Sequence, residues 1–178
     1  LDNVLANHCV NCQLINSALY IKNFASTINI IIHAVGILMV LPCILNDNET
    51  IQYVSLGAGN TGKKFDLETN FRIAEFKFIH WKGGPEAIRQ NGIFKDFFYL
   101  EKECTNKMKY LYLTGTKQAI SFFNGNRAIK SVLSKNDTAM KDFIATHKDI
   151  YNVVSDYYSA VKDKVNIVDL NKVTTYFE

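Results

Sequence analysis

The chain has 178 residues, of which 48% are apolar and 21% are charged, and its formal net charge is +3. This composition is typical of a folded globular protein and excludes a collagen-like or intrinsically disordered chain. The charge neither requires nor opposes a nucleic-acid partner. The length suits one domain with a sizeable core, and no linker rich in Pro, Gly or Ser divides it.

Residues from about 5 to 45 are expected to be helical, with a break near residues 23 to 26 that separates two helices. The stretch from Asn23 to Asn46 has no charged side chain, and its length would allow a membrane span. Three residues inside it count against such a span: Asn29, His33 and Pro42. A helix that is apolar on all sides also suits a protein core, and we expect that arrangement.

The cysteines predict plain thiols. Cys9 and Cys12 form a CxxC pair beside His8, but a structural zinc site usually needs a second ligand pair. Cys43 and Cys104 stand alone in the sequence. Because no disulfide framework is visible, we expect a reducing compartment, the cytoplasm.

Three strands are predicted next. Thr50 to Leu56 is rich in β-branched and aromatic residues, which favours a strand. A glycine-rich turn over residues 57–62 leads to a short second strand, Phe65 to Thr69. The third strand, Phe71 to Trp81, has apolar residues at both alternating positions, as expected for a central strand covered on both faces.

Pro85 predicts the start of a helix that runs to about Glu103, because proline is favoured in a first helical turn. Tyr110 to Thr114 and Ala119 to Phe123 are predicted as strands joined by a turn near Gly115. Asn124-Gly125-Asn126 indicates another turn.

Asp137 is expected to cap one long helix, since apolar residues repeat at helical spacing from Met140 to Val161. Asn166 to Leu170 is predicted as a final strand. The element order predicts a single α/β domain with a mixed β-sheet flanked by helices. Its core would span about residues 26–123, and an amphipathic helical extension would cover about residues 135–165.

The acidic and basic residues of the second and third strands form the candidate site. Alternate residues of a strand share a face, so Glu75 and Lys77 point the same way and Phe76 points into the opposite layer. Asp66 and Glu68 likewise share a face on the preceding strand. A hairpin-like return between the two strands would place Asp66 beside Glu75.

Neighbouring carboxylates repel one another, and one of them should take up a proton unless a cation is bound. Mg²⁺, with Mn²⁺ as a substitute, accepts one or two carboxylates together with substrate phosphates. Asp66 and Glu75 are therefore candidate ligands, with Lys77 beside them to contact a phosphate or the attacking water. Such a group predicts phosphodiester hydrolysis. The competing interpretation is an ion pair on the surface of an edge strand.

The pattern Phe65-Asp66 followed by Ala74-Glu75-Phe76-Lys77, in the order helix, three strands, helix, strand, resembles the PD-(D/E)xK nuclease superfamily. The resemblance covers about residues 26–123 and implies a restriction-endonuclease-like core. It also implies that Asp66, Glu75 and the backbone carbonyl of Phe76 bind the metal ion. Lys77 would orient or activate the water.

The chain departs from this family at several positions. Phe65 stands where the motif usually has proline, and the first helix offers no acidic residue. Glu68 is then a further candidate ligand, or the site holds a single metal ion. On the helix after the lysine strand, Gln90 and Lys95 are candidates for contacts with substrate, and for Gln90 ordinary helix packing is the alternative.

Gly57-x-Gly59-x-x-Gly62 matches a dinucleotide fingerprint in its letters only. That fingerprint needs a helix directly after it, whereas a strand is predicted here. A hairpin turn is the better interpretation, with Lys63 and Lys64 as candidate contacts to nucleic-acid phosphates. For Trp81, core packing is favoured over stacking on a base.

The sequence thus predicts a Mg²⁺-dependent endonuclease, with DNA favoured over RNA and a restriction or defence role suggested by the resemblance. A homodimer would suit the cutting of both DNA strands. One alternative is a catalytically inactive nuclease-like module for binding or assembly. The other is a membrane-anchored protein held by residues 23–46, although the polar residues of that stretch count against a membrane partner.

Overall fold

The computed structural model describes residues 12–57, 64–79, 81 and 86–177. Their elements in chain order are α2 (Cys12–Ile44), β1 (Ile51–Val54), β2 (Leu67–Thr69), β3 (Arg72–Lys77), α3 (Glu86–Lys102), β4 (Met108–Leu113), α4 (Lys117–Phe123), α5 (Ile129–Val132), α6 (Asp137–His147), α7 (Val154–Val161), η1 (Lys162–Lys164), β5 (Asn166–Asp169) and η2 (Leu170–Lys172). The predictions for His8, Cys9, Lys63, Pro85 and most of the glycine-rich turn lie outside the described residues.

The strands form one mixed sheet in the order β1-β2-β3-β4-β5. The pairs β1–β2 and β2–β3 are antiparallel, whereas β3–β4 and β4–β5 are parallel. The predicted mixed α/β fold is therefore confirmed, and β3 takes the central position expected from its sequence. It ends at Lys77 rather than continuing to Trp81.

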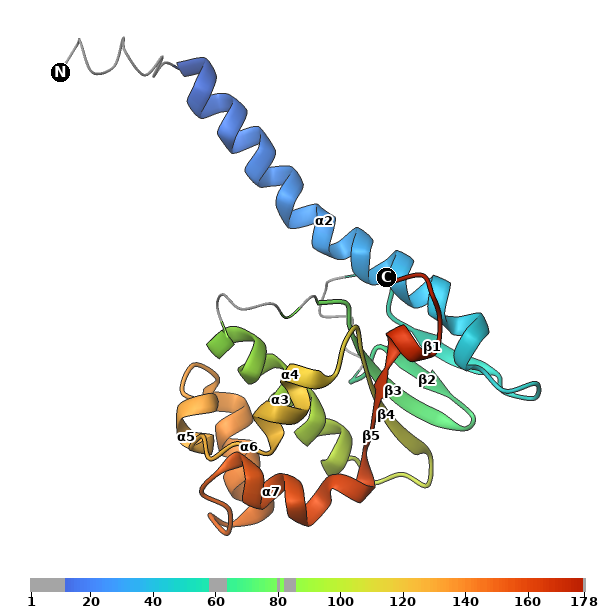
Figure 1. Ribbon diagram of the computed structural model, residues 1–178, viewed down its shortest axis with the longest axis vertical. Coiled ribbons are helices and arrows are strands. Elements are labelled where there is room, and N and C mark those ends of the chain that lie inside the picture. Colours follow the sequence, from blue (N-terminus) through green and yellow to red (C-terminus); the bar gives the residue numbers. More distant parts are fainter. Residues whose placement is uncertain (1–11, 58–63, 80, 82–85, 178) are drawn as a thin grey trace, which may run out of the picture.

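Both faces of the sheet are covered, as Figure 1 shows: α3 to α7 lie on one side and the C-terminal part of α2 lies on the other. The first face packs a largely aromatic cluster that includes Phe94, Phe97, Phe98, Leu111, Phe123, Phe143 and Tyr157. The second face packs a smaller cluster that includes Ile37, Val40, Leu67, Ala74, Phe76, Tyr112 and Leu170. Each fully buried large apolar side chain contributes about 1.5–3 kcal/mol to the stability of the fold.

Helix α2 is one continuous helix, so the predicted break near residues 23–26 is wrong. The break was inferred from polar residues, but neither Asn23 nor Ser26 removes a backbone donor, and the Thr27 hydroxyl donates to the carbonyl of Asn23. Pro42 lies inside the last turn, and the helix ends two residues later, at Ile44. Proline removes a helical hydrogen bond, which favours an end at this point.

Only the C-terminal part of α2 is the buried core helix that was expected. Ile37, Val40, Leu41 and Ile44 are buried against the sheet. Within that part, Val35, Leu38 and Met39 are exposed on the side away from the core. The rest of the helix also exposes large apolar side chains: Ile15, Leu19, Tyr20, Ile21, Phe24, Ile28, Ile31 and Ile32. Figure 1 shows this part projecting away from the sheet. From Ile15 to Ile44 the helix is long and apolar enough to cross a membrane.

The predicted strand Ala119 to Phe123 is wrong, because these residues belong to α4. The β-branched and aromatic content suggested a strand, but Ala119, Phe122 and Phe123 are buried at the i, i+3, i+4 spacing of a helix. Burial against the aromatic cluster thus decides the local conformation.

The predicted long helix from Met140 to Val161 is divided into α6 and α7. Lys148 and Asp149 have φ angles of 50° and 55°, in the left-handed region, which ends α6. The N-cap of α6 is Asn136 rather than Asp137, since the Asn136 side chain accepts a hydrogen bond from the Ala139 amide at 3.1 Å.

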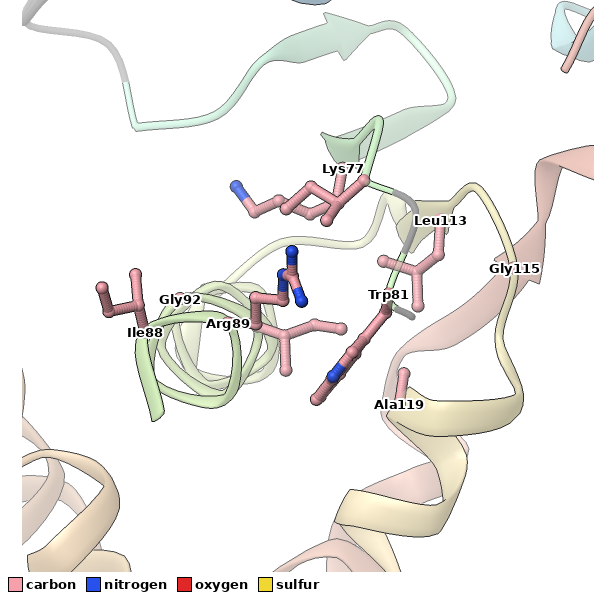
Figure 2. Close-up of a pocket in the computed structure, with 10 residues that line it drawn as sticks. Lys77, Trp81, Ile88, Arg89, Gly92, Leu113, Gly115 and Ala119 are labelled. Carbon is pink, nitrogen blue, oxygen red and sulfur yellow. The ribbon is translucent and has the colours of Figure 1, made fainter. Parts of the chain in front are cut away.

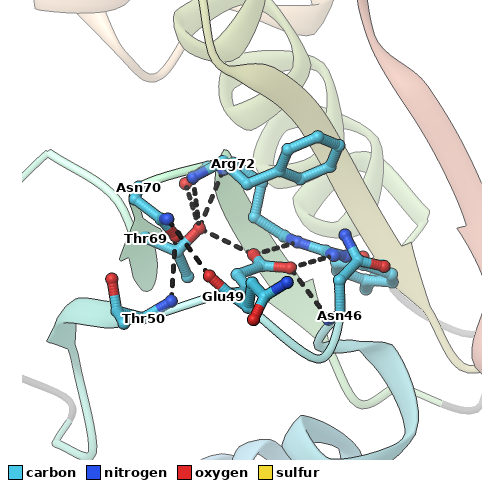
Figure 3. Close-up of polar contacts among 9 residues, drawn as sticks. Asn46, Glu49, Thr50, Thr69, Asn70 and Arg72 are labelled. Carbon is cyan, nitrogen blue, oxygen red and sulfur yellow. Dashed lines mark hydrogen bonds and ion pairs between the residues drawn. The ribbon is translucent and has the colours of Figure 1, made fainter.

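A buried ion pair holds the start of β3 in place (Figure 3). The Arg72 guanidinium donates to both carboxylate oxygens of Glu49, at 2.6 and 2.5 Å. The Thr69 hydroxyl donates to the same carboxylate at 2.6 Å, and Arg72 also donates to the Tyr112 hydroxyl at 2.7 Å. This network joins the segment after α2 to the β2–β3 turn and to β4, and thereby fixes the strands that carry the candidate site.

Candidate active site

On strand β3, Glu75 and Lys77 lie on the same face of the sheet, as predicted from the alternation of side chains along a strand. Phe76 is fully buried in the cluster beneath α2. Glu75 and Lys77 lie on the opposite face, toward α3, and are half-buried. An acid and a lysine therefore stand next to each other on the middle strand of the sheet.

Asp66 lies one residue before β2, and the strand register brings it to the level of Glu75. Leu67 pairs with Ala74 across the antiparallel ladder. The Phe76 amide donates a hydrogen bond to Asp66 Oδ2 at 3.0 Å. The side chains of Asp66 and Glu75 are hydrogen-bonded to each other. The structure thus brings together Asp66, Glu75 and Lys77.

Asp96 on α3 is a third acid at this site, and sequence reasoning missed it. Its side chain is 6% exposed, and Lys77 Nζ lies 2.5 Å from its Oδ2. The Lys95 ammonium lies 3.5 Å from the other oxygen. A signal was present, because Asp96 interrupts an aromatic run on α3 and an acid among core residues is rare unless it is paired.

His33 is the second residue that sequence reasoning did not place here. Its Nε2 lies 3.2 Å from Asp66 Oδ1. One turn further along α2, Gly36 faces the Phe78 ring so closely that a Cβ would lie 2.7 Å from it. Gly36 therefore lets the helix approach β3 closely enough for His33 to reach Asp66.

The electrostatics of the cluster follow from three carboxyl groups around one lysine. Burial, together with the charges of Asp96 and Asp66, raises the pKa of Glu75 to about 10, although Lys77 opposes the shift. Burial alone would raise the pKa of Asp66, but hydrogen bonds from His33 and from the Phe76 amide outweigh it and hold that pKa below its usual value. At neutral pH Glu75 therefore keeps its proton and Asp66 is ionised.

The pKa of Lys77 also departs from its usual value. Burial would lower the pKa of its ammonium, but the charges of Asp96 and Glu75 outweigh burial and raise it. Lys77 is therefore a permanent cation at physiological pH, held in position by Asp96.

The donor set can be compared with the needs of a divalent cation. Among the residues that the structure describes, no group of three or more acids, histidines or cysteines is arranged to hold a metal ion. Mg²⁺, however, is commonly bound by one or two carboxylates together with waters and substrate phosphates. The oxygen atoms of Asp66 and Glu75 fit that smaller requirement.

Two further candidate residues have other partners. Glu68 forms an ion pair with Lys107, with Nζ and Oε1 2.8 Å apart. The Gln90 side chain accepts a hydrogen bond from Arg127. The structure therefore pairs Glu68 with Lys107 and Gln90 with Arg127.

The candidate phosphate contacts are placed only in part. Lys64 is largely exposed and forms an ion pair with Glu103 at 2.9 Å. Lys95 is partly exposed and lies beside Asp96 at the site itself. Of these two lysines, Lys95 is the one that adds positive charge next to Lys77.

The order α2, β1, β2, β3, α3, β4 is the helix, three strands, helix, strand order that the sequence predicts. Comparison with protein-family models, curated proteins and solved structures finds no match for this chain.

Proposed function

We propose that this chain is a metal-dependent nuclease that hydrolyses phosphodiester bonds in DNA. The observation that carries the proposal is the half-buried, hydrogen-bonded pair of Asp66, just before β2, and Glu75 on β3, with Lys77 beside it. Two carboxyl groups in such a place destabilise the fold unless a proton or a cation separates their charges. A bound divalent cation would remove this repulsion, since Mg²⁺ is commonly held by one or two carboxylates together with substrate phosphates.

Each residue of the cluster would have a definite task. Asp66 and Glu75 would hold Mg²⁺ through their oxygens, with the Phe76 carbonyl as a further ligand. The ion, when bound, lowers the pKa of water and offsets negative charge on the phosphate. Lys77 would hold the scissile phosphate or the attacking water, with Asp96 positioning its ammonium. His33 would keep the Asp66 carboxylate oriented.

The fold gives secondary support to the proposal, whose main evidence is the group of Asp66, Glu75 and Lys77. The antiparallel β1-β2-β3 unit, followed by α3 and the parallel strand β4, is the arrangement expected of a restriction-endonuclease-like core. We therefore also propose DNA rather than RNA as substrate, and a restriction or defence role, both from the resemblance. A cytoplasmic location would accord with the exposed, unpaired thiols of Cys43 and Cys104.

A catalytically inactive binding module is the second candidate. Two observations favour it: Lys77 is engaged by Asp96, and the described residues contain no group of three metal ligands. In that case the cluster would serve only to hold β3 against α3, and nucleic acid would bind without being cut.

Membrane attachment is a third candidate, favoured by the exposed apolar side chains of α2. The segment 33–44 cannot leave the protein for a bilayer without exposing the sheet, because Ile37 and Val40 are fully buried. An anchor would therefore use the projecting part of α2, over residues 12–32. Flotation with liposomes would test this candidate.

A panel of substrates tests the nuclease proposal. Supercoiled plasmid, single-stranded DNA and RNA are incubated with the full chain in Mg²⁺, Mn²⁺ or EDTA. We expect DNA cleavage in either metal and none in EDTA. Binding of DNA without any cleavage would favour the inactive module instead.

A further inference from the structure

A cavity of about 260 Å³ opens beside Lys77, at the carboxyl ends of β3 and β4. One wall is formed by α3, through Arg89 and Gly92, and another by Ala119 of α4. In open α/β sheets, ligands bind in the crevice outside the carboxyl ends of the strands. The volume lies near the lower end of ligand pockets, roughly 300 Å³, so one flat ring system is the size of group that suits it.

The far wall is held rigidly. Gly115 follows β4 with a φ of 87°, which glycine adopts without strain. Asp169 at the end of β5 accepts hydrogen bonds from the amides of Gly115 and Thr116, at 3.1 and 3.2 Å, and from the Thr116 hydroxyl at 3.0 Å. The turn that borders the cavity is therefore fixed before any ligand arrives.

The lining combines apolar walls with an aromatic ring and two cations. Figure 2 shows the Trp81 ring on one side and the Lys77 and Arg89 side chains extending into the same space.

These features match one chemical class. A nucleotide carries a flat base, which stacks on aromatic rings, and a phosphate, which is attracted to lysine and arginine. Lys77 belongs both to the cavity and to the candidate active site, so a base in the cavity would lie next to a phosphate at that site.

We propose that this cavity binds one unpaired nucleobase of the substrate, adjacent to the phosphate that is cut. Its place next to that phosphate rests on the proposed nuclease function. A base in a duplex is stacked and paired, so it must be extruded or come from a single strand before it can enter. The inference therefore names the substrate class: single-stranded or locally unpaired nucleic acid.

Trp81 provides the readout, because it is the only tryptophan in the chain. Its fluorescence is followed while thymidine or adenosine 5′-monophosphate is added to the full chain in EDTA, where no cleavage can occur. Ribose 5-phosphate serves as the control that has the phosphate and lacks the base. We expect a saturable change with the nucleotides and at least about a tenfold weaker response, or roughly 1.4 kcal/mol, with the control.

The variant Gly92→Leu tests the location. A Cβ at position 92 meets no atom within 4 Å, so the new side chain enters open space in the cavity wall. Replacing glycine inside a helix also favours folding, because glycine loses more conformational freedom than other residues when the helix forms. We expect Gly92→Leu to fold with at least wild-type stability and to lose the fluorescence response, and Gly92→Ala to retain most of it.

The outcomes separate this inference from the nuclease proposal. An absent response, or an equal response in Gly92→Leu and wild type, overturns base binding in the cavity even if plasmid is cut in Mg²⁺. A nucleotide response that Gly92→Leu abolishes supports it. If that same protein cuts no nucleic acid, then the nuclease proposal fails while base binding stands.

Discussion

Lys77 Nζ lies 2.5 Å from Asp96 Oδ2, so the central strand and α3 are joined by an ion pair inside the candidate site. The Asp96 side chain is only 6% exposed. A charge so placed is stable only while its partner remains. The pair therefore has a structural role as well as the proposed catalytic one, and variants at Lys77 must be read with both roles in view.

Replacing Lys77 alone should destabilise the protein. Lys77→Met leaves the Asp96 carboxylate buried without its main partner, which typically costs about 3–5 kcal/mol. The double variant Lys77→Met/Asp96→Asn removes both charges, and we expect it to recover most of that loss. Urea unfolding followed by circular dichroism measures both, with Lys117→Met, at the exposed start of α4, as control. Equal losses in the single and double variants would contradict the pairing.

The pH dependence of stability should report the shifted carboxyl of Glu75. Its pKa is about 10 in the folded protein and near 4.5 when unfolded. The folded state therefore binds the extra proton between these values, and stability falls as pH rises through that window. The Glu75→Gln variant has no carboxyl proton to lose, so its stability should not fall for this reason. In EDTA, its melting temperature should exceed that of wild type more at pH 9 than at pH 5.

This loss of stability should be visible as a change in melting temperature. Each 1 kcal/mol shifts the melting temperature of a chain of this length by roughly 2–4 °C. The pKa of Asp66 is shifted downward and that of Lys77 upward, so neither titrates between pH 5 and pH 9. A melting-temperature difference that does not change with pH would show that Glu75 is not protonated in the folded protein.

Binding of Mg²⁺ should release a proton. A carboxyl group must be ionised to act as a metal ligand, and Glu75 is protonated at neutral pH. We expect about one proton released per ion near pH 7.5, and an affinity that rises about tenfold per pH unit. Calorimetry in two buffers of different ionisation enthalpy measures this release. The Glu75→Gln variant should release no proton when Mg²⁺ binds. An unchanged proton release in that variant would show that Glu75 is not a ligand of the ion.

The ion pair Glu49–Arg72 should be essential for the fold and not for chemistry. Arg72→Ala leaves the Glu49 carboxylate buried with the Thr69 hydroxyl and the Asn46 amide as donors. We expect a loss of about 3–5 kcal/mol. The matched variant Glu49→Gln/Arg72→Met should lose less, because no charge is left unpaired. Thermal unfolding measures both, and a loss below about 1 kcal/mol in Arg72→Ala would contradict this role.

The sheet was predictable because its signals are local. Alternating or continuous apolar residues identify β1 to β4, and the single acid of β3, Glu75, stands out against that background. The α4 segment was not predictable in this way, because its β-forming residues become helical only through burial against the aromatic cluster. The break between α6 and α7 depends on left-handed Lys148 and Asp149, which have no strong local signal.

The candidate site was predictable where neighbouring strands supply it. Asp66, Glu75 and Lys77 come from a short antiparallel return, whose register follows from strand periodicity. Asp96 and His33 come from helices that reach the site only through tertiary packing, one on each face of the sheet. Their contacts depend on helix placement, for example on the close approach at Gly36, which periodicity does not encode.

The most direct test compares plasmid cleavage by wild type, Asp66→Asn and Lys77→Met/Asp96→Asn in Mg²⁺ and in EDTA. Asp142→Asn, at a partly exposed carboxylate on α6, is the control. We predict cleavage by wild type and control in Mg²⁺, none in EDTA, and at least about a hundredfold loss in both site variants despite native folding. Cleavage that persists in the folded site variants, or that survives EDTA, would contradict the assignment of Asp66, Glu75 and Lys77 as a metal-dependent active site.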